Sequence, residues 1–353
     1  MKIARVETWR REIALTRPYE IAFRRTDSVG NCFVRLIPDR GQPGLGCAAP
    51  EHHVTGETLD DCEAALDPAG LDWLVGQPVA DLPRLLRELQ GHFPDTPAQR
   101  AALDMALHDL LAQQLERPLV DVLGRAQHSL PTSITIGIMG VDETLDEARE
   151  YIDRGFRHLK VKTGQDLEED IERIRALRTQ LGDDIQIRVD PNQGYTAKAL
   201  WEFVRDTKDY GLEFVEQPLP VSENMRSLSR TLRQRVAADE SLLSPDDALN
   251  LAAAPPACGV FNIKLMKCGG LGPARRIADI AELAGVELMW GCMDESRISI
   301  AAALHAALAC PATRYLDLDG HLDLAEDPAE GGFELKDGWL TPLSLPGLGV
   351  QLR

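Results

Sequence analysis

The sequence has 353 residues, 44% of them hydrophobic and 27% charged, and its 38 Lys and Arg against 56 Asp and Glu give a net charge of −18. Such a composition is ordinary for a folded, soluble protein, and the length favours two domains or one barrel with an attached domain. The negative charge disfavours nucleic acid and anionic membranes as partners, and it is consistent with either solubility alone or the attraction of a cationic ligand.

The compartment can be predicted from three features. Seven cysteines are spread along the chain without a Cys-x-x-Cys pair, so reduced thiols are expected rather than zinc or redox centres. Residues 1–12 mix charged with apolar side chains and do not form the apolar core of a signal peptide. The apolar stretch from Ile298 to Cys310 is shorter than the roughly 20 residues that a bilayer requires. We predict a cytoplasmic protein.

The first part of the chain has the pattern of a small α+β domain. Alternating residues predict strands over Ile3 to Glu12 and Cys32 to Ile37, and leucines at helical spacing predict a helix from Gln99 to Leu115. We place this domain at residues 1–125.

From about Ser129 short strands alternate with amphipathic helices, which is typical of βαβ units. The clearest helix spans Asp166 to Leu181. Periodicity alone also allows a doubly wound sheet, but eight units of similar length favour a closed barrel at residues 126–325. Residues 326–353 return to a short-strand pattern and are expected to pack on the first domain. The eight predicted strands are Ile134–Ile138, His158–Lys162, Ile185–Asp190, Leu212–Glu216, Val236–Asp239, Val260–Lys264, Glu287–Gly291 and Tyr315–Asp319.

Charged residues recur where these strands end, at intervals of about one βα unit, and barrel enzymes assemble their sites at that edge. Lysines 160 and 162 share one face of their strand. Three carboxylates without His or Cys suit Mg²⁺ better than zinc. The ordered set is Lys160, Lys162, Asp190, Glu216, Asp239 and Lys264.

The motifs around these residues resemble the muconate-lactonizing subgroup of the enolase superfamily, over nearly the whole chain. The resemblance implies a modified (β/α)₇β barrel with an α+β N-terminal capping domain, and Mg²⁺ on the three carboxylates. It also implies that Lys162 and Lys264 are opposed acid/base groups. The motifs are His158-Leu-Lys-Val-Lys162, Arg188-Val-Asp-Pro-Asn192, Phe214-Val-Glu-Gln-Pro218, Ala238-Asp-Glu-Ser241 and Asn262-Ile-Lys264 followed by Gly269-Gly270.

Proton removal alpha to a carboxylate creates an enediolate, whose negative charge Mg²⁺ neutralises; the superfamily is itself a known example of this pattern. We expect Lys160 to lower the pKa of its neighbour Lys162. One lysine on each side of the α-carbon predicts racemisation or epimerisation. The same site in relatives also performs cycloisomerisation or dehydration, so the lysines alone leave the reaction open.

The last strand ends in an Asp-x-Asp pair, Asp317 and Asp319, which strand alternation places on one face. In the dipeptide epimerases, which this stretch resembles, such a pair holds the α-ammonium group of the substrate. This favours a dipeptide epimerase over an N-acylamino acid racemase or an o-succinylbenzoate synthase, which need no ammonium clamp. A barrel that binds a chelated ligand without chemistry is disfavoured by the lysine pair.

The resemblance also implies that two loops of the first domain, near residues 16–29 and 48–58, close over the site and set the side-chain preference. Arg24 matches a position that binds the acidic side chain in L-Ala-D/L-Glu epimerases, whereas Glu51 and Asp294 favour a basic partner. We expect dipeptides with Lys or Arg, with Asn192 as a further substrate-binding residue. The roles of Cys47 and of the pair at positions 52 and 53 are not predicted, and homo-oligomers are common in the family.

Overall fold

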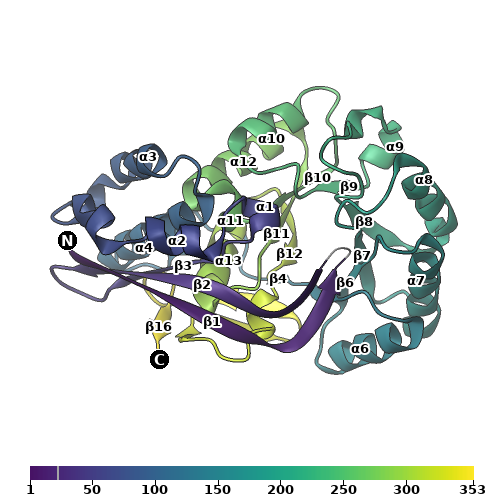
Figure 1. The fold of residues 1–353 in the computed structure, drawn as a ribbon, viewed down its shortest axis with the longest axis horizontal. Coiled ribbons are helices and arrows are strands. Elements are labelled where there is room, and N and C mark those ends of the chain that lie inside the picture. Colours follow the sequence, from purple (N-terminus) through teal and green to yellow (C-terminus); the bar gives the residue numbers. More distant parts are fainter. Residues whose placement is uncertain (22–23) are drawn as a thin grey trace.

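The computed structural model describes residues 1–21 and 24–353, and the side chains outside residues 18–25. The chain folds into an N-terminal layer of strands and helices that lies beside an eight-stranded parallel sheet surrounded by helices (Figure 1). In the described part of the chain, no helix combines the length and apolar character needed to cross a membrane.

The N-terminal layer is a three-stranded antiparallel sheet, β1 (Ile3–Ile21), β2 (Arg24–Pro38) and β3 (Gly44–Ala48), covered by helices. Both arms of the β1–β2 hairpin continue into residues 16–29, where the sequence predicted a loop. The sheet packs directly on the helix Pro97–Gln114. A Cβ added to Gly46 would lie only 1.8 Å from the carbonyl oxygen of Ala102 in this helix, so only glycine fits there. The helices are α1 (His52–Thr55), α2 (Leu59–Ala65), η1 (Pro68–Leu74), η2 (Val79–Asp81), α3 (Leu82–His92), α4 (Pro97–Gln114) and α5 (Leu119–Leu123).

The second region is a barrel whose parallel strands follow the order of the chain, β5 to β12. Its ends are joined, since Thr132 bridges to Leu316 and the amide of Ser133 donates to the Leu316 carbonyl at 3.0 Å. The strands are β5 (Ile134–Ile136), β6 (His158–Lys162), β7 (Gln186–Asp190), β8 (Leu212–Glu216), β9 (Val236–Ala238), β10 (Val260–Ile263), β11 (Glu287–Gly291) and β12 (Thr313–Asp317).

An α-helix follows every barrel strand except the last, which confirms the (β/α)₇β arrangement. They are α6 (Val141–Asp153), α7 (Leu167–Leu181), α8 (Ala197–Asp206) with η3 (Lys208–Tyr210), η4 (Met225–Ser227) with α9 (Arg230–Arg233), α10 (Pro245–Ala252), α11 (Leu265–Cys268) with α12 (Leu271–Ala284), and α13 (Arg297–Ala307). Inside the barrel, Phe214, Met289 and Tyr315 from three strands pack together, and the guanidinium of Arg188 lies 5.2 Å from both aromatic rings. The interior is therefore filled, and a ligand must bind at the open end.

The C-terminal tail contacts both the barrel and the N-terminal layer. Its β15 pairs with β4 (Leu130–Pro131) beside the barrel, and the amide of Leu348 donates to the carboxylate of Asp109 on α4 at 2.8 Å. Its elements are η5 (Gly320–Leu322), β13 (Ala329–Gly331), β14 (Phe333–Lys336), β15 (Trp339–Pro342) and β16 (Val350–Leu352).

Main-chain contacts join the hairpin to the barrel edge where the strands end. Leu15 bridges to Leu324, and the amide of Thr16 donates to the Asp323 carbonyl at 2.7 Å. The hairpin thus extends over the carboxyl ends of the barrel strands (Figure 1).

Candidate active site

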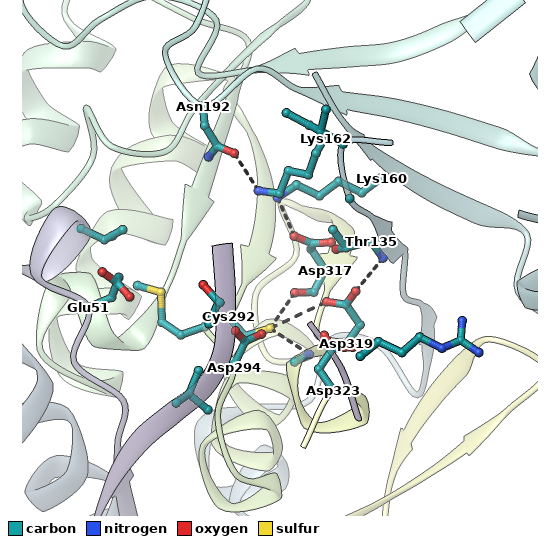
Figure 2. A pocket seen from close by; sticks show the side chains of 18 of the residues that line it. Glu51, Thr135, Lys160, Lys162, Asn192, Cys292, Asp294, Asp317, Asp319 and Asp323 are labelled. Atoms are coloured by element: carbon teal, nitrogen blue, oxygen red, sulfur yellow. Dashed lines mark hydrogen bonds and ion pairs between the residues drawn. The ribbon is translucent and has the colours of Figure 1, made fainter. Parts of the chain in front are cut away.

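A cavity of about 1400 Å³ opens between the hairpin, the segment after β3 and the carboxyl ends of the barrel strands. Eleven acidic and four basic side chains line it among the described residues. Figure 2 shows Lys160, Lys162 and Asn192 at one end of this cavity, and Asp294, Asp319 and Asp323 at the other. The cavity therefore has a strong excess of negative charge.

Three buried carboxylates stand behind the lysine end, as the strand spacing predicted. Asp190 and Glu216 are the last residues of β7 and β8, and Asp239 directly follows β9. Burial opposes ionisation of all three, but the charges of Lys162 and Lys160 bring the pKa of Asp190 to about 2. Burial and the charge of Asp190 raise the pKa of Glu216 to about 8. The ammonium groups of four lysines contact these carboxylates and balance their negative charge: Lys160, Lys162, Lys264 and Lys267.

Each of these carboxylates has one oxygen held by a fixed donor on the protein. The amide of Asn192, whose φ is +42°, donates to Asp190 Oδ1 at 3.0 Å. The side-chain amide of Asn262 donates to Glu216 Oε1 at 2.8 Å, and the Lys267 ammonium contacts Asp239 Oδ1.

The other oxygen of each carboxylate faces the lysines that the sequence identified. Lys160 Nζ lies 3.1 Å from Asp190 Oδ2 and 2.9 Å from Glu216 Oε2. Lys162 Nζ lies 2.7 Å from Asp190 Oδ2 and 2.9 Å from the Asn192 side-chain oxygen. Lys264 Nζ lies 2.8 Å from Asp239 Oδ2.

Lys162 and Lys264 approach this group from opposite sides. Lys162 ends β6, and Lys264 follows β10, four positions further round the ring of eight strands. Strands four apart in a closed eight-stranded barrel face each other across its axis. A small acid held between the two ammonium groups would present opposite faces of its α-carbon to them.

The three carboxylates are chemically suited to bind a hard divalent cation, because all their donor atoms are oxygens. They do not surround one point as they stand, since no group of three Asp, Glu, His or Cys side chains in the described ranges is assembled closely enough to hold a metal ion. However, Nζ of Lys160 contacts both Asp190 Oδ2 and Glu216 Oε2. These two oxygens are therefore close enough for one cation to contact both of them. Oxygen donors with no His or Cys among them are the set that Mg²⁺ prefers.

The Asp-x-Asp pair is divided between two environments. Asp317 ends β12 and binds Lys160 at 2.8 Å and the Ser133 hydroxyl at 2.5 Å. Asp319 lies beyond the strand, which ends two residues earlier than predicted, and its Oδ2 accepts the Thr135 amide at 2.7 Å. Strand alternation was therefore the wrong reason for placing both acids together, although both line the cavity.

The electrostatics of the two acids differ accordingly. Lys160 lowers the pKa of Asp317 against the effect of burial. Burial, followed by the charge of Asp317, raises the pKa of Asp319 to about 7. Asp319 forms no ion pair with any residue that the structure describes, so it is the acid of the pair that an incoming ammonium group stabilises more.

Comparison with known proteins identifies the family. A model of the mandelate racemase/muconate lactonizing enzyme N-terminal domain matches residues 4–124, and an enolase C-terminal domain-like model matches residues 143–353. The chain belongs to the enolase superfamily.

Two curated relatives cover nearly the whole chain. An L-Lys-D/L-Arg epimerase from Methylococcus capsulatus is 60% identical over 352 residues, with 99% of each chain covered. An L-Ala-D/L-Glu epimerase from Bacillus subtilis is 33% identical over 355 residues, with 99% of this chain and 97% of the relative covered. A solved structure of the Methylococcus capsulatus dipeptide epimerase, complexed with Mg and L-Arg-D-Lys, has a TM-score of 0.98, 60% identity and 99% coverage of both chains.

The residues that were expected to select the side chain in this enolase superfamily member lie on loops. Glu51 precedes α1 and Asp294 follows β11, and both line the cavity. The helix after Asp294 is capped by Ser296 instead of by Asp294. The side chain of Arg24 lies outside the described residues.

The structure also places residues whose roles were left open. Cys47 is buried and donates to the Asn31 side-chain oxygen at 3.3 Å, and Asn31 in turn donates to the Asp294 carbonyl at 3.2 Å. Cys47 thus supports the contact between the capping layer and a barrel loop. The rings of His52 and His53 pack edge to face on α1, and His53 lines the cavity.

Sequence reasoning missed two groups of residues. Lys267 and Asn262 hold the carboxylates from behind, and only the short spacing from Lys264 could have pointed to them. Asp323 was missed because it follows the barrel strands. Burial, with the charges of Asp319 and Asp294, raises the pKa of Asp323 to about 8.

Proposed function

We propose that the chain is a Mg²⁺-dependent dipeptide epimerase that prefers dipeptides with Lys or Arg side chains. The observation that carries the proposal is the arrangement of Lys162 and Lys264 on opposite sides of a buried group of three carboxylates. The relative complexed with Mg and L-Arg-D-Lys, at 60% identity, supports both the metal and the substrate class.

Asp190, Glu216 and Asp239 would hold the metal, which when bound supplies positive charge to the carboxylate of the substrate as its α-proton leaves. One of the opposed lysines, in its neutral form, removes the proton from the α-carbon, and the other, as the ammonium, donates a proton to the opposite face. Lys160 stays paired with Asp317 and balances the carboxylates. Asp319 accepts the α-ammonium group, which orients the α-carbon between the two lysines.

The cationic preference follows from the charge of the cavity. Asp323, Asp294 and Glu51 also line the cavity, so a substrate side chain that extends into it meets further carboxylates. An acidic substrate side chain would meet like charge here, at a cost that favours the basic partner. Alternative substrates are those of L-Ala-D/L-Glu epimerases, and the N-acylated amino acids of racemases.

The test is a comparison of substrates in deuterated water with Mg²⁺. Purified protein is incubated with L-Arg-L-Lys, L-Lys-L-Arg, L-Ala-L-Glu and N-succinyl-L-Arg, and α-proton exchange is followed by NMR. We expect kcat/KM for the cationic dipeptides to exceed that for L-Ala-L-Glu by about tenfold or more, the effect of one well-placed charge pair. Faster turnover of L-Ala-L-Glu would refute the preference, and faster turnover of N-succinyl-L-Arg would indicate a racemase.

We further propose a cytoplasmic location, which the seven free cysteines support, since an oxidising compartment favours disulfides. The proposed division into residues 1–125, 126–325 and 326–353 is supported by the antiparallel sheet at the start and the barrel strands in the middle. Cell fractionation tests the proposed location, and limited proteolysis tests the proposed domain division.

A further inference from the structure

Lys267 lies behind the site and is fully buried on α11. Its ammonium contacts Asp239 Oδ1, and it donates to the Asp239 carbonyl at 2.7 Å and the Asn262 carbonyl at 2.9 Å. An ammonium group has three protons to donate, and these three oxygens use all of them. Lys267 is therefore a fixed link between the residue after β9 and the middle of β10.

Asn262 continues this link to the next carboxylate. Its Nδ2 donates to Glu216 Oε1 at 2.8 Å, while its Oδ1 is buried and has no hydrogen-bond partner among the described residues. A buried acceptor without a partner costs free energy, so such groups need an explanation. The amide orientation seen here gives the carboxylate a donor and leaves Oδ1 unsatisfied.

Gly291 at the end of β11 provides the space for this arrangement. A Cβ at that position would lie 2.6 Å from Asn262 Oδ1 and 3.1 Å from the Cε of Lys264. Any larger residue would therefore displace the Asn262 amide and the catalytic lysine together.

We propose that Asn262 and Lys267 are positioning residues that set the affinity of the site for a divalent cation. They fix one oxygen of Glu216 and one of Asp239, so that the other oxygen of each faces the ammonium groups of Lys160 and Lys264. This inference rests on the proposed role of these carboxylates as Mg²⁺ ligands. Partners of ligand side chains outside the coordination sphere typically change metal affinity by about 10- to 100-fold when they are replaced.

The experiment measures Mg²⁺ binding by isothermal titration calorimetry in the absence of any dipeptide. The variants are Lys267→Met, which removes the donor, Lys267→Arg, which keeps a cation, and Asn262→Leu, which removes the amide. We expect the Kd for Mg²⁺ to rise about 10- to 100-fold in Lys267→Met and Asn262→Leu, and to rise less in Lys267→Arg. At saturating Mg²⁺, the KM for the dipeptide should stay near the wild-type value, because neither residue contacts substrate.

Arg188→Met is the matched control. Arg188 is an equally buried cation of the barrel, but it pairs with Glu213 at 2.9 Å and donates to the Leu316 carbonyl, away from the three carboxylates. It should lower Tm without changing the Kd for Mg²⁺.

Folded Lys267→Met and Asn262→Leu variants that bind Mg²⁺ with wild-type affinity would overturn the inference, as would an equal loss of affinity in Arg188→Met. If Lys267→Met does not fold, Asn262→Leu decides. Normal Mg²⁺ binding by the wild type without epimerisation of any dipeptide would instead refute the proposed function alone.

Discussion

The two ends of the cavity differ in how their charges are balanced. At the lysine end, each buried carboxylate meets an ammonium group, and each also has an oxygen fixed by a donor of the protein. At the other end, Asp319 and Asp323 have pKa values raised to about 7 and 8, chiefly by burial, and neither forms an ion pair with a described residue.

This difference assigns proton transfer to the lysine end of the cavity and substrate recognition to the end with Asp319 and Asp323. The balanced end is rigid and is built from strand ends, as acid/base chemistry at a fixed carbon requires. The unbalanced end is built from loops and a capping layer, and its excess negative charge is relieved when a cationic ligand binds. Changes at the first end should act on kcat, and changes at the second on KM.

Replacement of either opposed lysine should give the largest effect. Lys162→Ala and Lys264→Ala should each lower epimerisation by at least about 10³-fold, because each removes one of two proton-transfer groups. Each variant should still exchange the α-proton of the epimer that faces its remaining lysine. Exchange is measured by NMR in deuterated water with both epimers. Loss of exchange for the same epimer in both variants would contradict the opposed arrangement.

Asp319→Asn should come next, since it removes the charge that receives the α-ammonium group. We expect kcat/KM for a dipeptide to fall at least about 30-fold, the lower range for truncating a buried charge pair. Ser133→Ala is the control for local packing, because Ser133 contacts Asp317 instead of Asp319. A smaller effect for Asp319→Asn than for Ser133→Ala would contradict the assigned role.

The raised pKa of Asp319 predicts a pH dependence of substrate binding. Since burial raises this pKa to about 7, the binding-competent carboxylate predominates above pH 7 and is lost as the pH falls. The KM for a cationic dipeptide should therefore rise about tenfold per pH unit well below 7. Initial rates between pH 5.5 and 8.5 measure this, and a KM that is constant over that range would argue against Asp319 as the ammonium acceptor.

Changes at the loop acids should have the smallest effect. Glu51→Gln and Asp294→Asn should each raise the KM for Lys- or Arg-containing dipeptides about fivefold, the effect of a partly exposed charge pair, and leave L-Ala-L-Ala unaffected. Asp146→Asn is the control, because Asp146 also lines the cavity but pairs with Arg149 at 3.1 Å. An equal rise in KM for all three variants would indicate that the negative charge of the cavity attracts cationic dipeptides in general, without a specific role for Glu51 or Asp294.

The residues that the structure brings together at the lysine end could largely be located from the sequence, because most of them end or directly follow a barrel strand. Lys162, Asp190, Glu216 and Lys264 could be located by counting βα units. The recognition end was harder to predict. Asp323 lies outside the repeating units, and the cavity wall that it shares with Glu51 exists only after the capping layer folds over the barrel.

The fold differed from expectation mainly where tertiary contacts extend an element. The β1–β2 hairpin continues through the predicted loop because its arms pair with each other and with the segment near Leu324. Lys267 was not predicted, because a lone lysine near the end of a short helix is normally exposed to solvent, and its short spacing from Lys264 was the only signal.

The bridge from Leu15 to Leu324 uses backbone groups and so does not depend on which side chains stand at these positions. A chimaera that carries the first 125 residues of a relative on this barrel would therefore retain this bridge, and it would keep the other contacts where the relative also has Asn31 and Asp109. Such an exchange would replace Glu51 and its neighbours together, while the proton-transfer residues of the barrel stay unchanged. The side-chain preference can therefore change while the residues that carry out the reaction stay the same.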